Sequence, residues 1–343
     1  MPLPYQIPGL HLSRRASGQP AVVKSLQRDL RRLGYLATGI DGFFGRATDQ
    51  AVKALQHDLL FNCGGGGDGA APVKVRDYNR SRVEAVNGIL DQGLAAAMAD
   101  MLDDERFAKV PSSAAPAAEN ERIARQMESM RSEEIPVPFL VAVFRQESDL
   151  KHFREPSPNN DDSFVVVGLD RSSAAAAFVA SRGYGVGQYT LFHHPPSAAE
   201  VTRFILDPGS NILQAVAEFR EKFLFFVNGN TPGTRADDRQ AEYGRGALRR
   251  CRYPAADPRY MTGCRECLAA AGTIDIRAGL TKFYAGASRV YEPTGYHPEV
   301  EYRGVPVRAN IGCDWPYAVR RYNGGGLDSY HYQAQVLLRV LNG

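Results

Sequence analysis

Two stripes of apolar residues at helical spacing, separated by a loop that glycines punctuate, constrain this chain most strongly. The stripes comprise Val22, Val23, Leu26, Leu30 and Leu33, followed by Ala51, Val52, Leu55 and Leu59. Residues that recur every three or four positions share one face of a helix, and an apolar face of this kind is normally buried. The loop from Gly34 to Gly45 contains the turn dipeptide Asp41-Gly42, which favours a tight reversal. The pattern therefore predicts two short helices packed across a loop.

A third amphipathic segment, from Val83 to Leu102, is expected to close this pair into a three-helix bundle. A glycine run from Gly64 to Gly67 precedes this segment and is expected to form a flexible loop. Together these segments predict a first domain over residues 20–107.

The rest of the chain is predicted to form a second, mostly helical domain. Residues 108–120 have the Pro, Ser and Ala content of a linker, so the second domain is expected over residues 121–343, with an insertion around residues 228–272. The expected elements are helices over 121–130, 138–150, 211–227 and 330–341, and a strand-like run over 164–167. The predicted fold class is mainly α, within the α+β class, with a small β element.

Composition excludes several classes of function. The net charge is +3, and Lys and Arg are spread along the chain, which does not indicate a nucleic-acid-binding protein. No apolar run approaches the length of a membrane span, so no stable membrane insertion is expected. The first nine residues, Met1 to Gly9, lack a basic region followed by an apolar one, so no secretory signal is expected there.

The helix-loop-helix pattern also contains a family motif. It runs from Val23-x2-Leu26-Gln27 through Leu33-Gly34-Tyr35 and Asp41-Gly42-x-Phe44-Gly45 to Leu55-Gln56, and more weakly over Val86 to Asp91. This arrangement resembles the peptidoglycan-binding domain found beside many wall hydrolases. The resemblance implies that peptidoglycan is a partner and that it binds near the Gly34 to Gly45 loop, where Tyr35 and Phe44 would offer ring faces and Asp41 would belong to the binding surface. In the simpler alternative, the leucines only form a core and the glycines only form turns.

A single glutamate is the strongest catalytic candidate in the second domain. In the segment Pro138 to Ser148, helical spacing puts Leu140, Val143 and Phe144 on the face that carries Glu147. An apolar surrounding penalises the ionised form of a carboxyl group and raises its pKa, as a general acid requires. The alternative is a solvated glutamate paired with Lys151.

Three ordered motifs favour the catalytic interpretation: Glu147-Ser148, then Gly183 to Tyr189, then Ala318 to Gly326. Their order resembles the lytic transglycosylase family of the lysozyme superfamily. The resemblance implies that Glu147 is the acid and base, that Gln188 binds substrate, and that Tyr322 and Asn323 line the site and hold Glu147 or the substrate. The other residues expected to contact substrate are Ser148, Tyr184, Gly187 and Tyr189. Gly185 and Gly187 have the alternative role of a tight turn.

The implied reaction cleaves the β-1,4 bond between N-acetylmuramic acid and N-acetylglucosamine and gives a 1,6-anhydro product. One alternative is a goose-type hydrolytic muramidase, which needs a second carboxylate to activate water; Asp161, Asp162 and Asp170 are the candidates. Another alternative is a non-catalytic wall-anchoring protein. No cofactor and no metal are expected.

A wall-active chain without a secretory signal is expected to be made in the cytoplasm and to act in the periplasm or cell wall. It would be released as a phage endolysin or injected as an antibacterial effector by a secretion machine. An immunity or delivery protein of unknown identity is the expected protein partner.

The five cysteines are unevenly placed. Cys63 stands alone, whereas Cys251, Cys264, Cys267 and Cys313 belong to the C-terminal half. That quartet is compatible with disulfides, free thiols or zinc. At least one disulfide is expected if the protein acts outside the cytoplasm, joining Cys264 or Cys267 to Cys251 or Cys313.

Overall fold

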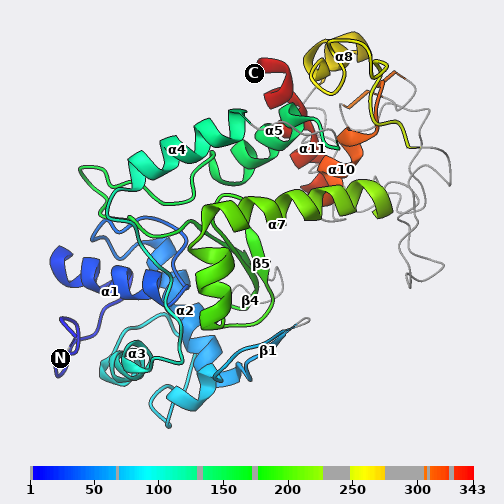
Figure 1. The fold of residues 1–343 in the computed structure, drawn as a ribbon. Coiled ribbons are helices and arrows are strands. Elements are labelled where there is room, and N and C mark those ends of the chain that lie inside the picture. Colours follow the sequence, from blue (N-terminus) through cyan, green and yellow to red (C-terminus); the bar gives the residue numbers. More distant parts are fainter. Residues whose placement is uncertain are drawn as a thin grey trace, which may run out of the picture. The chain divides into compact units, whose positions relative to one another are not determined.

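The computed structural model describes residues 3–66, 69–129, 134–171, 177–226, 248–274, 305–306, 310–323 and 328–343. These residues are mainly helical (Figure 1). They also form a three-stranded and a two-stranded antiparallel sheet. The expectation of a mainly α chain with a small β element is confirmed. The chain divides into two compact units: a first unit of Met1–Ala124 and Lys151–Ile212, and a second unit of Arg125–Leu150 and Leu213–Gly343.

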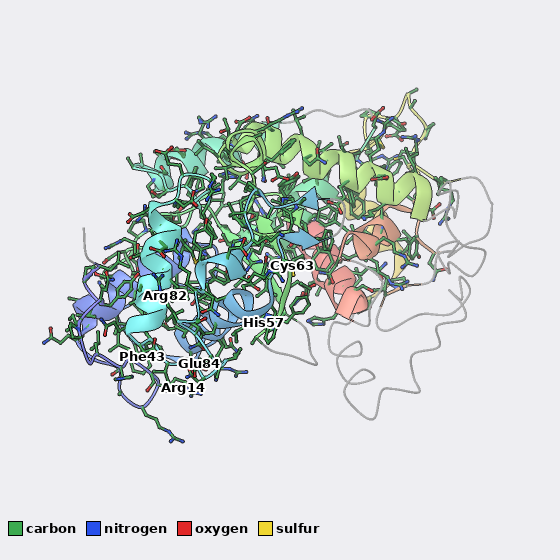
Figure 2. All side chains as sticks on the ribbon, turned by 90° about the horizontal axis from the view of Figure 1, so that it is seen from below. Arg14, Phe43, His57, Cys63, Arg82 and Glu84 are labelled. Carbon is green, nitrogen blue, oxygen red and sulfur yellow. The ribbon has the colours of Figure 1, made fainter. Side chains whose placement is uncertain are left out.

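The N-terminal part of the first unit holds three helices: α1 (Pro20–Arg32), α2 (Arg46–Phe61) and α3 (Gln92–Asp103). Between α2 and α3 lie β1 (Gly65–Gly66), β2 (Gly69–Ala70) and the 3-10 helix η1 (Val75–Tyr78). The third helix begins nine residues later than the sequence predicted, because Asp91 caps it by accepting a hydrogen bond from the Leu94 backbone N–H at 2.8 Å. Arg82 and Glu84, which Figure 2 labels, therefore belong to an irregular segment before the helix.

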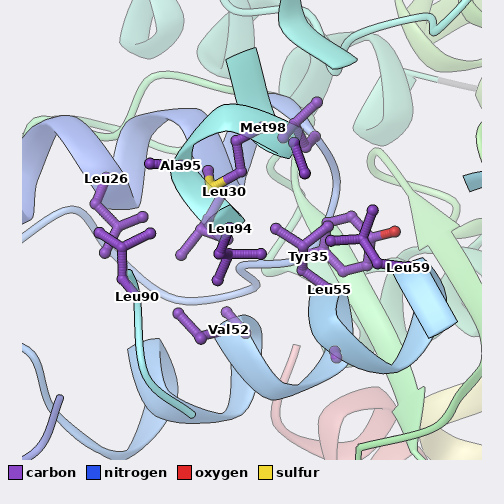
Figure 3. Close-up of a cluster of buried hydrophobic side chains, with 14 of the residues drawn as sticks. Leu26, Leu30, Tyr35, Val52, Leu55, Leu59, Leu90, Leu94, Ala95 and Met98 are labelled. Carbon is purple, nitrogen blue, oxygen red and sulfur yellow. The ribbon is translucent and has the colours of Figure 1, made fainter. Parts of the chain in front are cut away.

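Both predicted stripes enter the core of the first unit. Figure 3 shows Leu26 and Leu30 of α1 meeting Val52 and Leu55 of α2, with α3 contributing its own apolar side chains. These side chains are fully buried, which explains why the helical periodicity was so regular. Their burial also supplies much of the free energy that holds the three helices together.

A three-stranded sheet follows later in the chain but belongs to the same unit. The strands β3 (Val167–Arg171), β4 (Val179–Tyr184) and β5 (Tyr189–Leu191) lie in the order β3-β4-β5. The predicted run over residues 164–167 is strand only at its last residue, since Phe164 and Val165 make isolated bridges with Ser112 and Phe153. After the sheet come the short α6 (Ala198–Glu200) and the π-helix η2 (Val201–Ile205).

The two units do not follow the predicted boundary. Residues 151–212 were expected in the C-terminal domain, but they group with residues 1–124. The predicted linker is a packed segment, because the Val110 N–H donates to the Arg32 carbonyl at 2.8 Å and the Ser113 N–H donates to the Ser163 carbonyl at 3.0 Å. Its last residues already belong to α4 (Pro116–Ser129).

The described residues of the second unit form helices joined by turns and irregular segments. Helix α5 (Val137–Ser148) packs against α11 (Asp328–Asn342), which also contacts α8 (Cys264–Ala271) and α10 (Trp315–Tyr322). Helix α7 (Pro208–Glu221) enters from the first unit and continues into the π-helix η3 (Lys222–Phe226). Residues 228–247 of the predicted insertion lie outside the described residues, whereas its end forms α8.

Candidate functional site

Helix α5 presents Glu147 in its last turn, next to an apolar face. Leu140, Val143 and Phe144 are each 1% exposed, as the spacing predicted, and Glu147 is half-buried. The helix stops directly after Ser148, because Asp149 takes a left-handed conformation with φ of 57° and its N–H closes back on the Arg145 carbonyl. Glu147 is thus held at the helix end.

Within the described part of the chain, a tyrosine donates a hydrogen bond to the carboxyl group of Glu147. The Tyr332 hydroxyl, on α11, donates to Glu147 Oε1 at 2.6 Å. Burial raises the pKa of Glu147, the Tyr332 hydrogen bond lowers it, and the charge of Glu218 on α7 raises it. The expected alternative pairing with Lys151 is absent from the ion pairs of the described residues, since Lys151 pairs with Glu155 at 3.4 Å.

The charge of this carboxyl group raises the pKa of two tyrosines. Burial first, and then the charge of Glu147, raise the pKa of both Tyr322 and Tyr332 well above the usual range. The Tyr322 ring also packs edge-on against Phe219, with centroids 6.0 Å apart. The sequence motif pointed to Tyr322 and missed Tyr332, which carries the hydroxyl that bonds Glu147. No local signal marks Tyr332, because it lies in an ordinary helical pattern 185 residues further along the chain.

The other expected residues of the second unit have local roles in the structure. The Ser148 hydroxyl donates to the Phe144 carbonyl of its own helix at 3.1 Å. Asn323 is exposed and ends α10 as its C-cap residue. The glycines that follow it, Gly324 to Gly326, lie outside the described residues.

The segment expected to bind substrate through Gln188 forms the turn between β4 and β5. Gly185 has φ of +73°, the Gly187 N–H donates to Asn211 Oδ1 at 2.7 Å, and Gln188 Nε2 donates to the Gly185 carbonyl at 2.8 Å. These contacts are those of a tight turn, the alternative role considered for the glycines. The turn belongs to the first unit, whereas Glu147 belongs to the second.

The two tyrosines beside this turn differ from the expectation that both line a sugar site. Tyr184 is fully buried in the core of the first unit, so its ring has no free face, and this expectation is wrong. Tyr189 is half-buried and stacks on Phe204, with centroids 4.7 Å apart.

The three aspartates proposed as a second carboxylate all lie in the first unit. Asp161 pairs with Lys24 at 3.0 Å, and Asp162 pairs with Arg31 at 3.1 Å with both side chains buried. Asp170 is exposed on β3. Two of the three aspartates are therefore engaged in ion pairs. In the second unit, Glu218 is the carboxylate whose charge raises the pKa of Glu147.

The expected wall-binding rings are not available either. Tyr35 is 0% exposed and Phe44 is 1% exposed, because the helix-loop-helix core closes over both. Asp41 holds the loop together by accepting hydrogen bonds from Gln27 Nε2 at 2.8 Å and from the Phe43 N–H at 2.9 Å. Phe43, at 65% exposure, is the ring that this loop shows to solvent.

Comparison with known proteins adds one finding. The family model "Putative peptidoglycan binding domain" matches residues 19–59, which span α1, the loop and nearly all of α2. The match supports association with peptidoglycan. It does not extend to Glu147 or to any other residue of the second unit. Searches of curated proteins and of solved structures found no match.

Three further properties concern the described residues alone. None of their helices combines the length and the apolar character needed to cross a membrane. No three or more His, Cys, Asp or Glu side chains in this part of the chain are grouped so as to hold a metal ion. All five cysteines are described and none is in a disulfide, so the expected bridge is not formed in this structure.

Proposed function

We propose that this chain binds peptidoglycan and cleaves its glycan strands, with Glu147 as the general acid. The proposal rests on the environment of Glu147. This residue lies in the last turn of α5, next to the buried apolar face of the helix, and the Tyr332 hydroxyl donates to its Oε1 at 2.6 Å. The matched segment at residues 19–59 supports the wall as the substrate. The ordered resemblance to lytic transglycosylases supports the choice of the glycosidic bond.

In the proposed reaction, protonated Glu147 gives its proton to the oxygen between N-acetylmuramic acid and N-acetylglucosamine. Burial raises the pKa of Glu147 and so keeps the transferable proton on the group at higher pH. The N-acetyl group of the muramic acid stabilises the cationic sugar centre as the bond breaks. The Glu147 carboxylate then accepts the proton of the C6 hydroxyl as that oxygen attacks, which closes a 1,6-anhydro ring and restores the acid.

Transglycosylation is preferred over hydrolysis because it needs a single carboxyl group, whereas an inverting hydrolase needs a second to activate water. Asp161 and Asp162 are engaged in ion pairs within the first unit. Glu218, whose charge acts on the pKa of Glu147, pairs with Lys222 at 3.3 Å. Glu218 is the group to test if hydrolysis is found.

The decisive experiment compares purified sacculi treated with the wild-type protein and with Glu147→Gln. The amide keeps the size of the side chain and can still accept from Tyr332, but it has no proton to transfer. We expect loss of glycan release by at least about a hundredfold, retention on sacculi, and wild-type products that are lighter by one water at the muramic end.

A matched control is Glu221→Gln, which neutralises an exposed glutamate of α7 in the same unit. It should leave glycan release unchanged. Substantial activity in Glu147→Gln contradicts the assignment of the acid. Products without loss of water identify a hydrolase, and sacculus binding without any cleavage by the wild-type chain identifies the non-catalytic wall-anchoring alternative.

We further propose that the protein acts in the periplasm or cell wall. Release as a phage endolysin and injection as an antibacterial effector both fit a wall-degrading activity, and an immunity or delivery protein would be the partner in the second case.

A further inference from the structure

A cavity of about 470 Å³ opens in the first unit, where the end of α2 meets β4 and the segment after β5. This volume lies within the range of typical small-molecule sites. The lining residues that matter chemically are Asp58, Phe61, Phe178, Arg182, Phe192 and His194. The family match ends at residue 59, so the cavity joins the end of the matched helix to residues far outside the match.

Phenylalanines from separate chain segments form its walls. Phe61 is 61% exposed, Phe178 is 42% exposed and Phe192 is 58% exposed. The His57 ring braces two of these walls, with centroids 4.9 Å from Phe61 and 5.5 Å from Phe178. Exposed aromatic rings that gather around one cavity mark a binding surface more often than a folding core.

The base of the cavity carries charges that cancel. Arg182 pairs with Asp58 at 3.1 Å, and both side chains are at most 5% exposed. The pair is held further by the Tyr35 hydroxyl, which donates to Asp58 at 2.9 Å, and by the Gly34 carbonyl, which accepts from Arg182 at 3.1 Å. A ligand therefore meets rigid polar groups without a net charge.

His194 adds a neutral ring to the lining of the cavity. It is 2% exposed, and both ring nitrogens are buried, with the Leu33 backbone close enough to act on the pKa of the ring. Burial lowers the pKa of His194 well below its usual range, and the charge of Arg182 lowers it further, so the ring is uncharged at neutral pH. The lining next to the Asp58–Arg182 pair therefore adds no net charge.

We propose that this cavity binds an N-acetylhexosamine ring of the wall glycan, stacked on Phe192 and Phe178 with its polar groups toward the neutral base of the cavity. A pyranose ring has an apolar C–H face for the aromatic walls, and hydroxyl and acetamido groups for a neutral polar base. A charged stem peptide would instead favour a base with a net charge. The assignment rests on the proposed association with peptidoglycan and moves its contact point from the Gly34 to Gly45 loop to the end of α2.

The chain contains its own reporter for this cavity. Cys63 is exposed and lines both this cavity and a neighbouring one of about 500 Å³. Figure 2 labels Cys63, which follows α2, and Phe43, which lies in the loop before α2 and does not line the cavity. The rate at which maleimide labels Cys63 therefore reports whether this cavity is occupied, and it does not depend on binding in the second unit.

The test measures the rate of maleimide labelling of Cys63 in the full chain with increasing concentrations of the N-acetylglucosamine trimer. Cys63→Ser identifies the part of the labelling that belongs to this thiol. We expect saturable protection by the trimer, about tenfold weaker in Phe192→Ala and nearly unchanged in Phe192→Tyr, because the ring face is kept. Phe43→Ala is the matched control, since it removes a phenylalanine of similar exposure that does not line the cavity.

Several outcomes overturn the proposal. Equal losses in Phe43→Ala and Phe192→Ala would place the sugar on the loop, and protection by a stem peptide but not by the trimer would exclude a sugar site. Absence of protection, while the Glu147→Gln chain is still retained on sacculi, overturns the cavity assignment and leaves the wall association standing. Failure of that chain to be retained on sacculi overturns the wall association itself, and the cavity assignment with it.

Discussion

Two opposing influences act on Glu147 at the scale of a single residue. Burial and the charge of Glu218 favour the protonated form, whereas the Tyr332 hydrogen bond favours the carboxylate. A group that must first give and then take a proton needs both forms within reach. The balance between these influences sets the pKa of Glu147, and thus the pH above which Glu147 has no proton to give in the proposed reaction.

Tyr332→Phe should therefore move the basic limb of the pH-activity profile to higher pH. The variant keeps the ring but removes the donor that stabilises the ionised carboxylate, so the pKa of Glu147 rises further. Glycan release from sacculi, measured across a pH series, gives the limb directly. Tyr260→Phe is the control, because Tyr260 is not among the groups that shift the pKa of Glu147. A limb that moves to lower pH would contradict the role of the hydrogen bond.

His152 makes the stability of the protein depend on pH. Its Nε2 lies 2.8 Å from the Ile205 carbonyl and its Nδ1 accepts from the Val186 N–H at 3.3 Å, so the neutral ring satisfies both contacts. Burial lowers the pKa of His152 from 6.5 to about 4. Between these values the unfolded chain takes up a proton that the folded chain refuses, so the free energy of unfolding falls as the pH drops through this window.

The expected loss is on the order of 3 kcal/mol between about pH 6.5 and about pH 4. Urea unfolding at several pH values measures it. His152→Gln should flatten this dependence while costing stability at neutral pH, and His11→Gln, at an exposed histidine, should leave the dependence unchanged. An equally steep dependence in His152→Gln would show that other groups cause it.

At the scale of elements, the β4–β5 turn depends on the absence of a side chain at Gly185. The residue has φ of +73°, and an added Cβ would lie 2.5 Å from a ring carbon of His152 and 2.9 Å from Asn211 Nδ2. These two side chains hold the turn, and neither has room to move because both are fully buried.

Gly185→Ala should lower the free energy of unfolding by at least about 2 kcal/mol, the sum of backbone strain and displaced buried groups. Gly9→Ala is the matched control: its φ is +75°, but nothing lies within 4 Å of the added atom. It should cost only the backbone strain, about 1 kcal/mol. Chemical denaturation of both variants separates the two contributions, and equal losses would contradict the steric argument.

The same scale shows where sequence patterns succeed. The apolar stripes of α1, α2 and α5 predicted which faces are buried, because helical periodicity is a local property. The start of α3 was missed because the Asp91 cap outweighs a weaker pattern before it. Tyr35 and Phe44 were expected at the surface because an aromatic ring in a glycine-rich loop carries no local sign of the core that closes over it.

At the scale of the whole molecule, the assembly of the first unit from two chain segments was not predictable from local patterns. Its two fully buried ion pairs, Arg31 with Asp162 and Arg182 with Asp58, join residues 131 and 124 positions apart. The residues around one member of such a pair do not indicate where in the sequence its partner lies. The apolar face of α5 next to Glu147 was predictable, because its whole pattern lies within twelve consecutive residues.

Arg182→Ala should consequently destabilise α2, although it lies far along the chain. Removing the cation leaves the buried carboxylate of Asp58 with the Tyr35 hydroxyl but without its arginine, and breaking a buried pair in this way typically costs about 3–5 kcal/mol. Hydrogen exchange of the α2 amides in the full chain measures the effect at the predicted place. Arg76→Ala, which removes one member of an exposed pair with Asp77 at 3.9 Å, should change the exchange of these amides very little. Unchanged exchange in Arg182→Ala would mean that the matched segment is stable without residues 151–212.

The chain passes between the two units at three places, after residues 124, 150 and 212. Each unit is built from two chain segments that pack together. After one protease cut at any of these places, the two segments of a unit either stay joined through the chain or are held together by their packing. A single nick therefore does not release the wall-binding part from the part that carries Glu147. Exchange of residues 1–124 with those of another protein would likewise remove Arg31 and Asp58, so recombination that moves this part alone would leave Asp162 and Arg182 buried without their ion-pair partners.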